Sequence, residues 1–200
     1  MCRSSSGPAR ALSSGEFEIR PFRNADGPRV RELVIAVNRL LSPSDLRDAF
    51  EAYIERALAD EIDRIEDYYS EHGGGFWVAT LGGGLVGTLG LERASADAME
   101  LRRMYVDPAA RRVGIGRRML QHAEAECRRR GVKRLELSTA KIQNEAIALY
   151  RSAGYRLVRE ELAEHGSNKT VGSGMRRLYF EKALSEAGSD NRVILAAHHS

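Results

Sequence analysis

Cysteine is scarce in this 200-residue sequence, which contains only Cys2 and Cys127. Two cysteines are too few for the disulfide framework of a small secreted protein. Long apolar runs are also missing, because no stretch approaches the roughly 20 residues that a membrane-spanning helix needs. We therefore expect a cytoplasmic protein that works in a reducing compartment and does not act in a membrane.

Two common phosphate-binding signatures are absent as well. No Gly-Lys-Ser/Thr follows a glycine-rich loop, which excludes a P-loop. The dinucleotide fingerprint needs three glycines and an acidic residue about twenty positions later, and this pattern does not occur either. No His, Cys and Asp residues recur at metal-ligand spacing, so the sequence predicts no metal site.

The composition is that of a globular protein, with 42% hydrophobic and 30% charged residues. The length suffices for one domain with a substantial core. Residues 1–15 are rich in Ser, Ala and Gly and lack the apolar stretch of a secretory signal, so we expect a disordered leader there. We expect a single domain over residues 16–184 and a loose tail over residues 185–200.

Apolar periodicity predicts a mixed α/β (α+β) fold. Strand patterns occupy residues 17–22, 76–80, 85–92, 99–106, 134–139, 155–160 and 176–182. Helical patterns end near residue 41, run over residues 45–70 as one helix or two with a kink, and precede Gly131 and Gly154. Helices, an antiparallel meander, a strand–helix–strand crossover and a closing hairpin together describe a sheet covered by helices.

The most informative segment is the turn before the third helical pattern. Gly114 and Gly116 remove Cβ atoms where a ligand would have to approach backbone N–H groups. A helix start supplies free N–H donors and a positive dipole end, which suit a pyrophosphate. Four arginines add positive charge at the same point: Arg111, Arg112, Arg117 and Arg118.

Charge is unevenly distributed along the chain. Residues 101–134 carry eleven Lys/Arg against three Asp/Glu, whereas residues 45–71 carry ten acids against three arginines. The basic segment suits a polyphosphate ligand. The acidic segment could attract a cationic amine, although a solvated helix face is the plainer reading.

Arg111, Gly114 and Gly116 match the Q/R-x-x-G-x-G/A pattern, and their surroundings match too. Residues 99–106 look like the strand before this turn, and residues 146–155 fit an A-I-x-L-Y-x-x-x-G-F/Y helix. In these features residues 17–184 resemble the GNAT superfamily of N-acetyltransferases. The resemblance implies a mostly antiparallel sheet that splays between its fourth and fifth strands, where acetyl-CoA would bind as co-substrate.

The resemblance also implies which residues contact coenzyme A. These are Met104, Tyr105, Val106, Arg111, Arg112, Val113, Gly114, Ile115, Gly116, Arg117, Gln143 and Asn144. Two positions depart from the family pattern. Gln143 stands where asparagine is common, and its longer amide changes the reach toward the pantetheine arm. Arg112 stands where glycine is frequent, and it either grips a phosphate or is solvated.

Two side chains are candidates for catalysis. The resemblance makes Tyr150 the acid that protonates the departing thiolate, whereas helical spacing alone would make it a core aromatic. Glu100 resembles the base of several family members, and strand alternation places it on one face with Arg102, Met104 and Val106. Glu100 could equally be a surface glutamate paired with an arginine, with a water wire accepting the proton.

The predicted activity is transfer of an acetyl group from acetyl-CoA to a primary amine of a small molecule. A non-catalytic acyl-CoA sensor or partner-binding module, and acetylation of a protein amine, remain alternatives. Nucleic-acid binding ranks last, since one pyrophosphate already accounts for the arginines and no aromatic residues are interleaved with them. Dimers are frequent in the superfamily, so a homodimer stays open.

Overall fold

The computed structural model describes residues 15–184. The predicted leader, apart from Gly15, and the predicted tail at residues 185–200 lie outside these described residues. Among the helices in this range, none has the length and apolar character required to cross a membrane.

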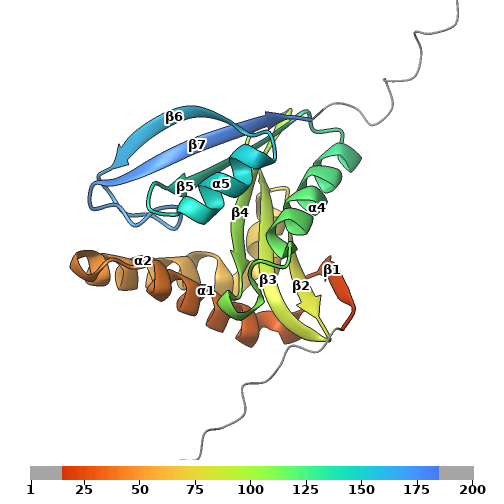
Figure 1. Ribbon diagram of the computed structural model, residues 1–200, viewed down its shortest axis with the longest axis horizontal. Helices are drawn as coiled ribbons and strands as arrows, with labels where there is room; N and C mark the ends of the chain where they lie inside the picture. The colour runs from red at the N-terminus through yellow and green to blue at the C-terminus, as the bar shows by residue number, and fades with distance from the viewer. Residues whose placement is uncertain (1–14, 185–200) are drawn as a thin grey trace, which may run out of the picture.

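One sheet of seven strands runs through the described part of the chain (Figure 1), with the strand order β1-β2-β3-β4-β5-β7-β6. Its strands are β1 (Phe17–Pro21), β2 (Gly75–Leu81), β3 (Gly84–Arg93), β4 (Ala98–Val106), β5 (Arg134–Ala140), β6 (Arg156–Ala163) and β7 (Met175–Ala183). Within this sheet β4 and β5 are parallel, and the other neighbours are antiparallel. The mixed, mostly antiparallel sheet predicted from the sequence is confirmed.

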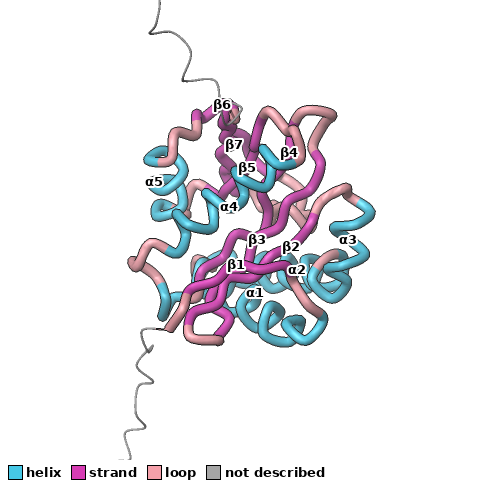
Figure 2. Tube along the Cα trace, turned by 90° about the vertical axis from the view of Figure 1, so that its right-hand side faces the viewer, coloured by secondary structure: helices cyan, strands magenta, loops and turns pink. Residues whose placement is uncertain are grey.

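Helices cover both faces of the sheet (Figure 2). They are α1 (Gly27–Leu41), α2 (Arg47–Asp60), α3 (Ile65–Glu71), α4 (Ile115–Arg129) and α5 (Asn144–Ser152). On one face α4 and α5 pack into a core that includes Met119, Leu120 and Tyr150. On the other face α1, α2 and α3 pack over Phe76 and Val78 of β2.

The helical pattern over residues 45–70 is interrupted at Glu61. Helix α2 ends at Asp60, a short 3-10 turn covers Ile62–Arg64, and α3 follows. Glu61 has φ −136° and ψ −57°, outside the helical region, and its side chain is completely buried. The interruption therefore turns a carboxylate into the protein instead of leaving it on the solvated face of a continuous helix.

The sheet opens between β4 and β5. Their pairing stops at Leu101 and Leu137, whereas β5 continues to pair with β7 as far as Ala140. Beyond Leu101, the last part of β4 thus has no hydrogen-bonded neighbour on the β5 side. This confirms the predicted splay and creates the space in which the candidate site lies.

A bulge in β4 overturns one prediction. Arg103 and Met104 together lie opposite the single residue Leu89, and Arg103 has a positive φ of 48°. A two-against-one pairing shifts the alternation of every later side chain. The expectation of regular alternation over the whole strand was wrong. The periodicity of one strand does not reveal that it carries an extra residue relative to its neighbour.

The side chains of β4 are redistributed as a result. Met104 and Val106 pack with the α4 core, on the same face as Leu101. Arg102 and Arg103 instead both point toward Glu61 on the opposite face. The predicted common face for Glu100, Arg102, Met104 and Val106 therefore does not exist.

Candidate functional site

A pocket of about 910 Å³ lies where β4 and β5 separate. We call it the large pocket. Its walls come from the end of β4, the glycine turn and first turn of α4, the last residues of α1, and α5. Three segments far apart in the sequence thus meet around one space, next to the unpaired edge of β4.

The glycine turn presents free backbone donors to the large pocket. The first hydrogen bond at the start of α4 runs from the Arg118 N–H to the Gly114 carbonyl at 3.1 Å, so the amides of residues 114–117 have no intrahelical acceptor. Gly114 has φ +81°, which an L side chain rarely adopts. A Cβ at Gly116 would lie 3.2 Å from Leu149 Cδ2. These features fit a phosphate cradle of the kind the sequence predicts.

The four arginines of this region do not act alike. Arg111 and Arg117 line the large pocket, and Arg112 lines it with a side chain that is 88% exposed. Arg112 approaches Glu145 at 3.4 Å and has a positive φ of 65°. Arg118 turns away, because its guanidinium lies 3.9 Å above the ring of Phe17. Three arginines therefore remain around the free amides, and Glu145, which also approaches Arg111 at 3.5 Å, offsets one of their charges.

The large pocket brings together the residues predicted to contact coenzyme A, with one exception. Val113 is 67% exposed and is not among the residues that line it. Gln143 is tied to the end of β5, since its side-chain carbonyl accepts a hydrogen bond from the Thr139 hydroxyl. The amide that replaces the expected asparagine is thereby held at the start of α5. For all of the residues predicted to contact coenzyme A, the contact itself remains a prediction.

Tyr150 lies at the junction of the large pocket with a second one. Its side chain is buried, and it lines both spaces. Burial raises the pKa of the Tyr150 phenol well above its ordinary value of 10. The hydroxyl is therefore protonated at neutral pH, and burial also makes it a weaker acid.

The second space has a volume of about 100 Å³ and is called the small pocket. It shares Met104, Tyr105, Gln143 and Tyr150 with the large pocket. Its further walls come from α2, β5, β7 and the loop between β6 and β7. The two pockets thus meet at the bulged end of β4.

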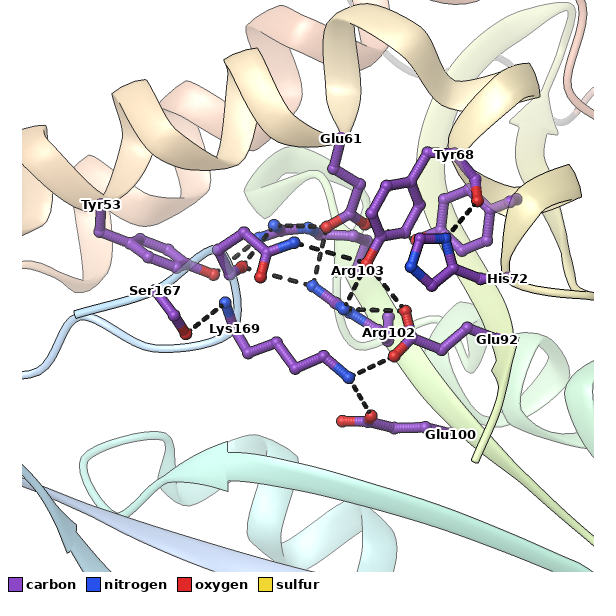
Figure 3. Close-up of polar contacts among 12 residues, drawn as sticks. Tyr53, Glu61, Tyr68, His72, Glu92, Glu100, Arg102, Arg103, Ser167 and Lys169 are labelled. Carbon is purple, nitrogen blue, oxygen red and sulfur yellow. Dashed lines mark hydrogen bonds and ion pairs between the residues drawn. The ribbon is translucent and has the colours of Figure 1, made fainter. Parts of the chain in front are cut away.

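Glu100 lines the small pocket and not the large one. Its carboxylate accepts a hydrogen bond from the Lys169 ammonium at 2.7 Å, and Lys169 comes from the loop between β6 and β7 (Figure 3). The alternative of a glutamate paired with Arg102 or Arg103 is replaced by this lysine contact. The carboxylate still faces the small pocket, so a role in proton transfer remains a proposal.

A buried charge network lies beside the small pocket. Arg102 and Arg103 donate to the same Glu61 oxygen at 2.8 and 2.7 Å (Figure 3). The Tyr69 hydroxyl donates to the other oxygen at 2.5 Å. Burial alone would lower the pKa of Arg103, but the neighbouring Tyr53 and Glu61 raise it well above its ordinary value. Glu61 therefore fixes both arginine side chains.

Glu92 on β3 extends the network toward Lys169. Its carboxylate accepts hydrogen bonds from Arg102 at 2.8 Å and from Tyr68 at 3.0 Å, and it contacts the Lys169 ammonium. Burial alone would raise the pKa of Glu92, but Arg102 and Lys169 outweigh it and lower the pKa. Lys169 thus links the buried carboxylate to Glu100 at the pocket wall.

Tyr105 completes the wall between the pockets. Its hydroxyl accepts a hydrogen bond from Asn38 Nδ2 at 3.3 Å. Burial would raise the pKa of this phenol, but the charge of Arg103 and the hydrogen bonds lower it below its ordinary value. By contrast, burial raises the pKa of Tyr53 to about 12. Arg103 therefore favours the charged form of both tyrosines, but at Tyr53 burial outweighs its effect.

The acidic segment over residues 45–71 does not supply a wall of free carboxylates. None of its Asp or Glu side chains lines the large or the small pocket. Helix α2 contributes Phe50 and Tyr53 to the small pocket. Glu61 is the acid of this segment in the network, and two arginines neutralise it. The idea that this segment attracts a cationic amine therefore finds no support.

Sequence reasoning did not find the network. Two adjacent arginines inside an otherwise apolar strand, and an acid at the end of a helical pattern, were usable signals for Arg102, Arg103 and Glu61. Lys169 carried no signal because it lies in a loop. Arg177, which lines the small pocket from β7, carried none either, because that strand alternates in the ordinary way. Within residues 15–184, no group of three or more His, Cys, Asp or Glu side chains could hold a metal.

A family model described as the acetyltransferase (GNAT) family matches residues 43–155, which include the glycine turn and all of α5. The chain belongs to the GNAT family of acetyltransferases. The match extends from α2 to the end of α5 and so includes β4, the splay and Tyr150.

Several curated proteins are similar in sequence. An uncharacterised N-acetyltransferase of Escherichia coli (strain K12), YjgM, is 35% identical over 97 residues, 47% of this chain and 58% of that protein. The N-acetylaspartate synthetase of Danio rerio is 33% identical over 136 residues, 65% of this chain and 46% of that protein. The chain spans about half the length of the curated relatives it matches.

Solved GNAT structures share the fold. PaiA N-acetyltransferase from Thermoplasma acidophilum, in complex with coenzyme A, has a TM-score of 0.67 at 19% identity and covers 84% of this chain and 99% of that one. The ribosomal-protein-S18-alanine N-acetyltransferase from Escherichia coli has a TM-score of 0.62 at 21% identity, covering 88% of this chain and 98% of that one.

Proposed function

We propose that this GNAT protein transfers an acetyl group from acetyl-CoA to a primary amine of a small-molecule acceptor. The observation that carries the proposal is the large pocket, which joins a cradle of free amides at Gly114 to a buried, protonated Tyr150. In an acyl-CoA the pantetheine arm separates the pyrophosphate from the thioester, so the cradle suits the first group and Tyr150 the second.

Acetyl transfer by direct attack forms a C–N bond and breaks the C–S bond of the thioester. The carbonyl oxygen gains negative charge on the way and needs hydrogen-bond donors. The unpaired edge of β4 at Met104–Val106 offers backbone N–H groups on the β5 side of the splay. Their role does not depend on side-chain identity.

The departing thiolate needs a proton, and the Tyr150 hydroxyl is the proposed donor. The attacking amine must lose a proton, and we assign its acceptance to Glu100, directly or through water in the small pocket. Attack would then proceed from the small pocket onto a thioester in the large pocket, where the two spaces meet.

A small-molecule acceptor is favoured over a protein amine because of the size of the small pocket. About 100 Å³ is room for several water molecules at about 10–15 Å³ each, and not for a folded peptide loop. The relative from Danio rerio is named for an acetylated amino acid, which is consistent with a small acceptor.

The test begins with thermal unfolding at increasing acetyl-CoA concentration. A ligand at 100 times its Kd adds about 2.7 kcal/mol to the free energy of unfolding, which gives a clear rise of the midpoint. Thiol release in the presence of an amine panel then measures turnover. A rise without turnover on any amine would favour the sensor alternative, and a flat midpoint would contradict the proposal.

A further inference from the structure

Arg177 on β7 differs from the other cations of the small pocket. Its Nη1 donates to the Lys169 carbonyl at 2.6 Å, and its Nη2 contacts the Ser138 hydroxyl. Over residues 15–184 it forms no salt bridge with an Asp or Glu side chain. A half-buried guanidinium therefore lines the small pocket with neutral partners alone.

The charges around the small pocket do not balance without a ligand. Four cations, Arg102, Arg103, Lys169 and Arg177, face three carboxylates, Glu61, Glu92 and Glu100. The three carboxylates are all engaged by Arg102, Arg103 and Lys169. One positive charge is left over, and it belongs to Arg177. Because partly desolvated charges are costly without a partner, this excess favours an anion in the pocket.

Arg103 adds an unsatisfied donor and backbone strain to the wall of the small pocket. The Arg103 side chain is only 3% exposed, and its buried Nε atom has no hydrogen-bond partner among the described residues. The backbone there has a positive φ of 48°, a conformation that costs about 1–3 kcal/mol for a non-glycine residue. Strain and an unsatisfied donor thus coincide in the wall of the same pocket.

The two pockets define the direction of a bound acceptor. Tyr105 and Tyr150 lie where the pockets meet, whereas Arg177 and Lys169 line the small pocket only. An acceptor in the small pocket would place its amine toward the large pocket and its other end toward Arg177. A guanidinium is well suited to bind a carboxylate, because its parallel N–H groups match the two oxygens.

We propose that the acceptor is an amino acid, whose carboxylate binds Arg177 while its amine is acetylated. This assignment rests on the proposed function and narrows its substrate class. It replaces the cationic acceptor suggested by the acidic segment with a zwitterionic one. Arg177 is a binding residue in this scheme and takes no part in proton transfer.

The experiment compares amino acids with their carboxamides, which have nearly the same shape and the same primary amine but no carboxylate. Thiol release is measured for eighteen proteinogenic amino acids and their matching amides, leaving out proline, whose amine is secondary, and cysteine, whose own thiol would mask the signal. For the best acceptor we expect kcat/KM to exceed that of its amide at least tenfold. In Arg177→Gln this ratio should fall close to one through a higher KM for the amino acid, and Arg177→Lys should restore part of it.

Arg176→Gln is the matched control. Arg176 precedes Arg177 on β7, its side chain is 53% exposed, and it pairs with Glu160 outside the small pocket. The preference for the carboxylate should persist in this variant. Thermal unfolding of each variant with acetyl-CoA checks that folding and the large pocket are intact.

Each outcome bears on the inference. Equal use of amides and amino acids, or an unchanged ratio in Arg177→Gln, would overturn it while leaving the acetyltransferase proposal standing. If no amine turns over, binding of the same amino acids and amides to the CoA-loaded protein is followed by the unfolding midpoint. A midpoint rise for an amino acid, but not its amide, that is lost in Arg177→Gln supports the inference without catalysis, and no such rise overturns it.

Discussion

Arg103 Nη2 donates to Glu61 Oε2 at 2.7 Å, which joins the bulge of β4 to the break between α2 and α3. Arg103 lies at the bulge of a strand and Glu61 between two helices, and neither side chain is more than 3% exposed. The contact explains why both irregularities occur. Each one turns a charged side chain inward, and each charge is acceptable only in the presence of the other.

Glu61→Gln is predicted to destabilise the protein strongly. The change leaves Arg102 and Arg103 buried without their shared carboxylate, and breaking a buried ion pair costs about 3–5 kcal/mol. Denaturant unfolding of the variant and the wild type measures this difference. Glu66→Gln, the same change at an exposed position on α3, should alter the free energy of unfolding by about 0.5 kcal/mol or less. Similar values for the two variants would contradict the role of the network.

Gly114→Glu is predicted to abolish acetyl-CoA binding. A carboxylate at this position would occupy the cradle and repel the pyrophosphate. Gly83→Glu is the control, because Gly83 has nearly the same φ, +80° against +81°, and a Cβ at either position meets nothing within 4 Å. Both variants should lose similar stability from backbone strain, about 1–2 kcal/mol. Only Gly83→Glu should keep the rise of the unfolding midpoint with acetyl-CoA, and a rise in both would refute the cradle.

Tyr150→Phe is predicted to lower kcat by about 10²-fold or more, the usual contribution of a positioned proton donor. The unfolding midpoint should rise with acetyl-CoA as in the wild type, since the ring that lines the pocket is retained. Tyr155→Phe makes the same change at a buried tyrosine that lines neither pocket. Its kcat should be close to that of the wild type. Unchanged turnover in Tyr150→Phe would assign the tyrosine to the core alone.

The pH dependence of stability should include a contribution from Glu126 on α4. Hydrogen bonds from Arg129 and Arg130 outweigh burial and lower the pKa of this carboxyl from 4.5 to about 2. A lowered folded-state pKa stabilises the protein above pH 4.5, and this stabilisation is lost as the pH falls through about 2. The midpoint of Glu126→Gln should therefore lie below that of the wild type at pH 7, with a gap that closes between pH 4.5 and 2.

Glu32→Gln serves as the comparison for that pH series. Glu32 is 68% exposed and has a single arginine contact at 3.3 Å, so its removal should change the midpoint far less. A gap for Glu126→Gln that stays constant down to pH 2 would show that packing, and not ionisation, causes the destabilisation.

The sequence was sufficient for features that repeat or that follow local rules. Apolar periodicity located the strands and helices, and the glycines of the turn indicated a helix start with free amides. The bulge was missed because Arg103 and Met104 are compatible with an ordinary strand, and only pairing with Leu89 reveals the extra residue. Lys169 was missed because its partners, Glu92 and Glu100, are more than 60 residues away.

The parallel ladder between β4 and β5 spans only four residue pairs, from Ala98–Arg134 to Leu101–Leu137. Within residues 15–184, it is the only strand pairing that connects the β1–β4 half of the sheet to the β5–β7 half (Figure 1). The two halves of the sheet are therefore joined through one short ladder. A molecule bound in the gap would contact both halves and would restrict their movement relative to each other.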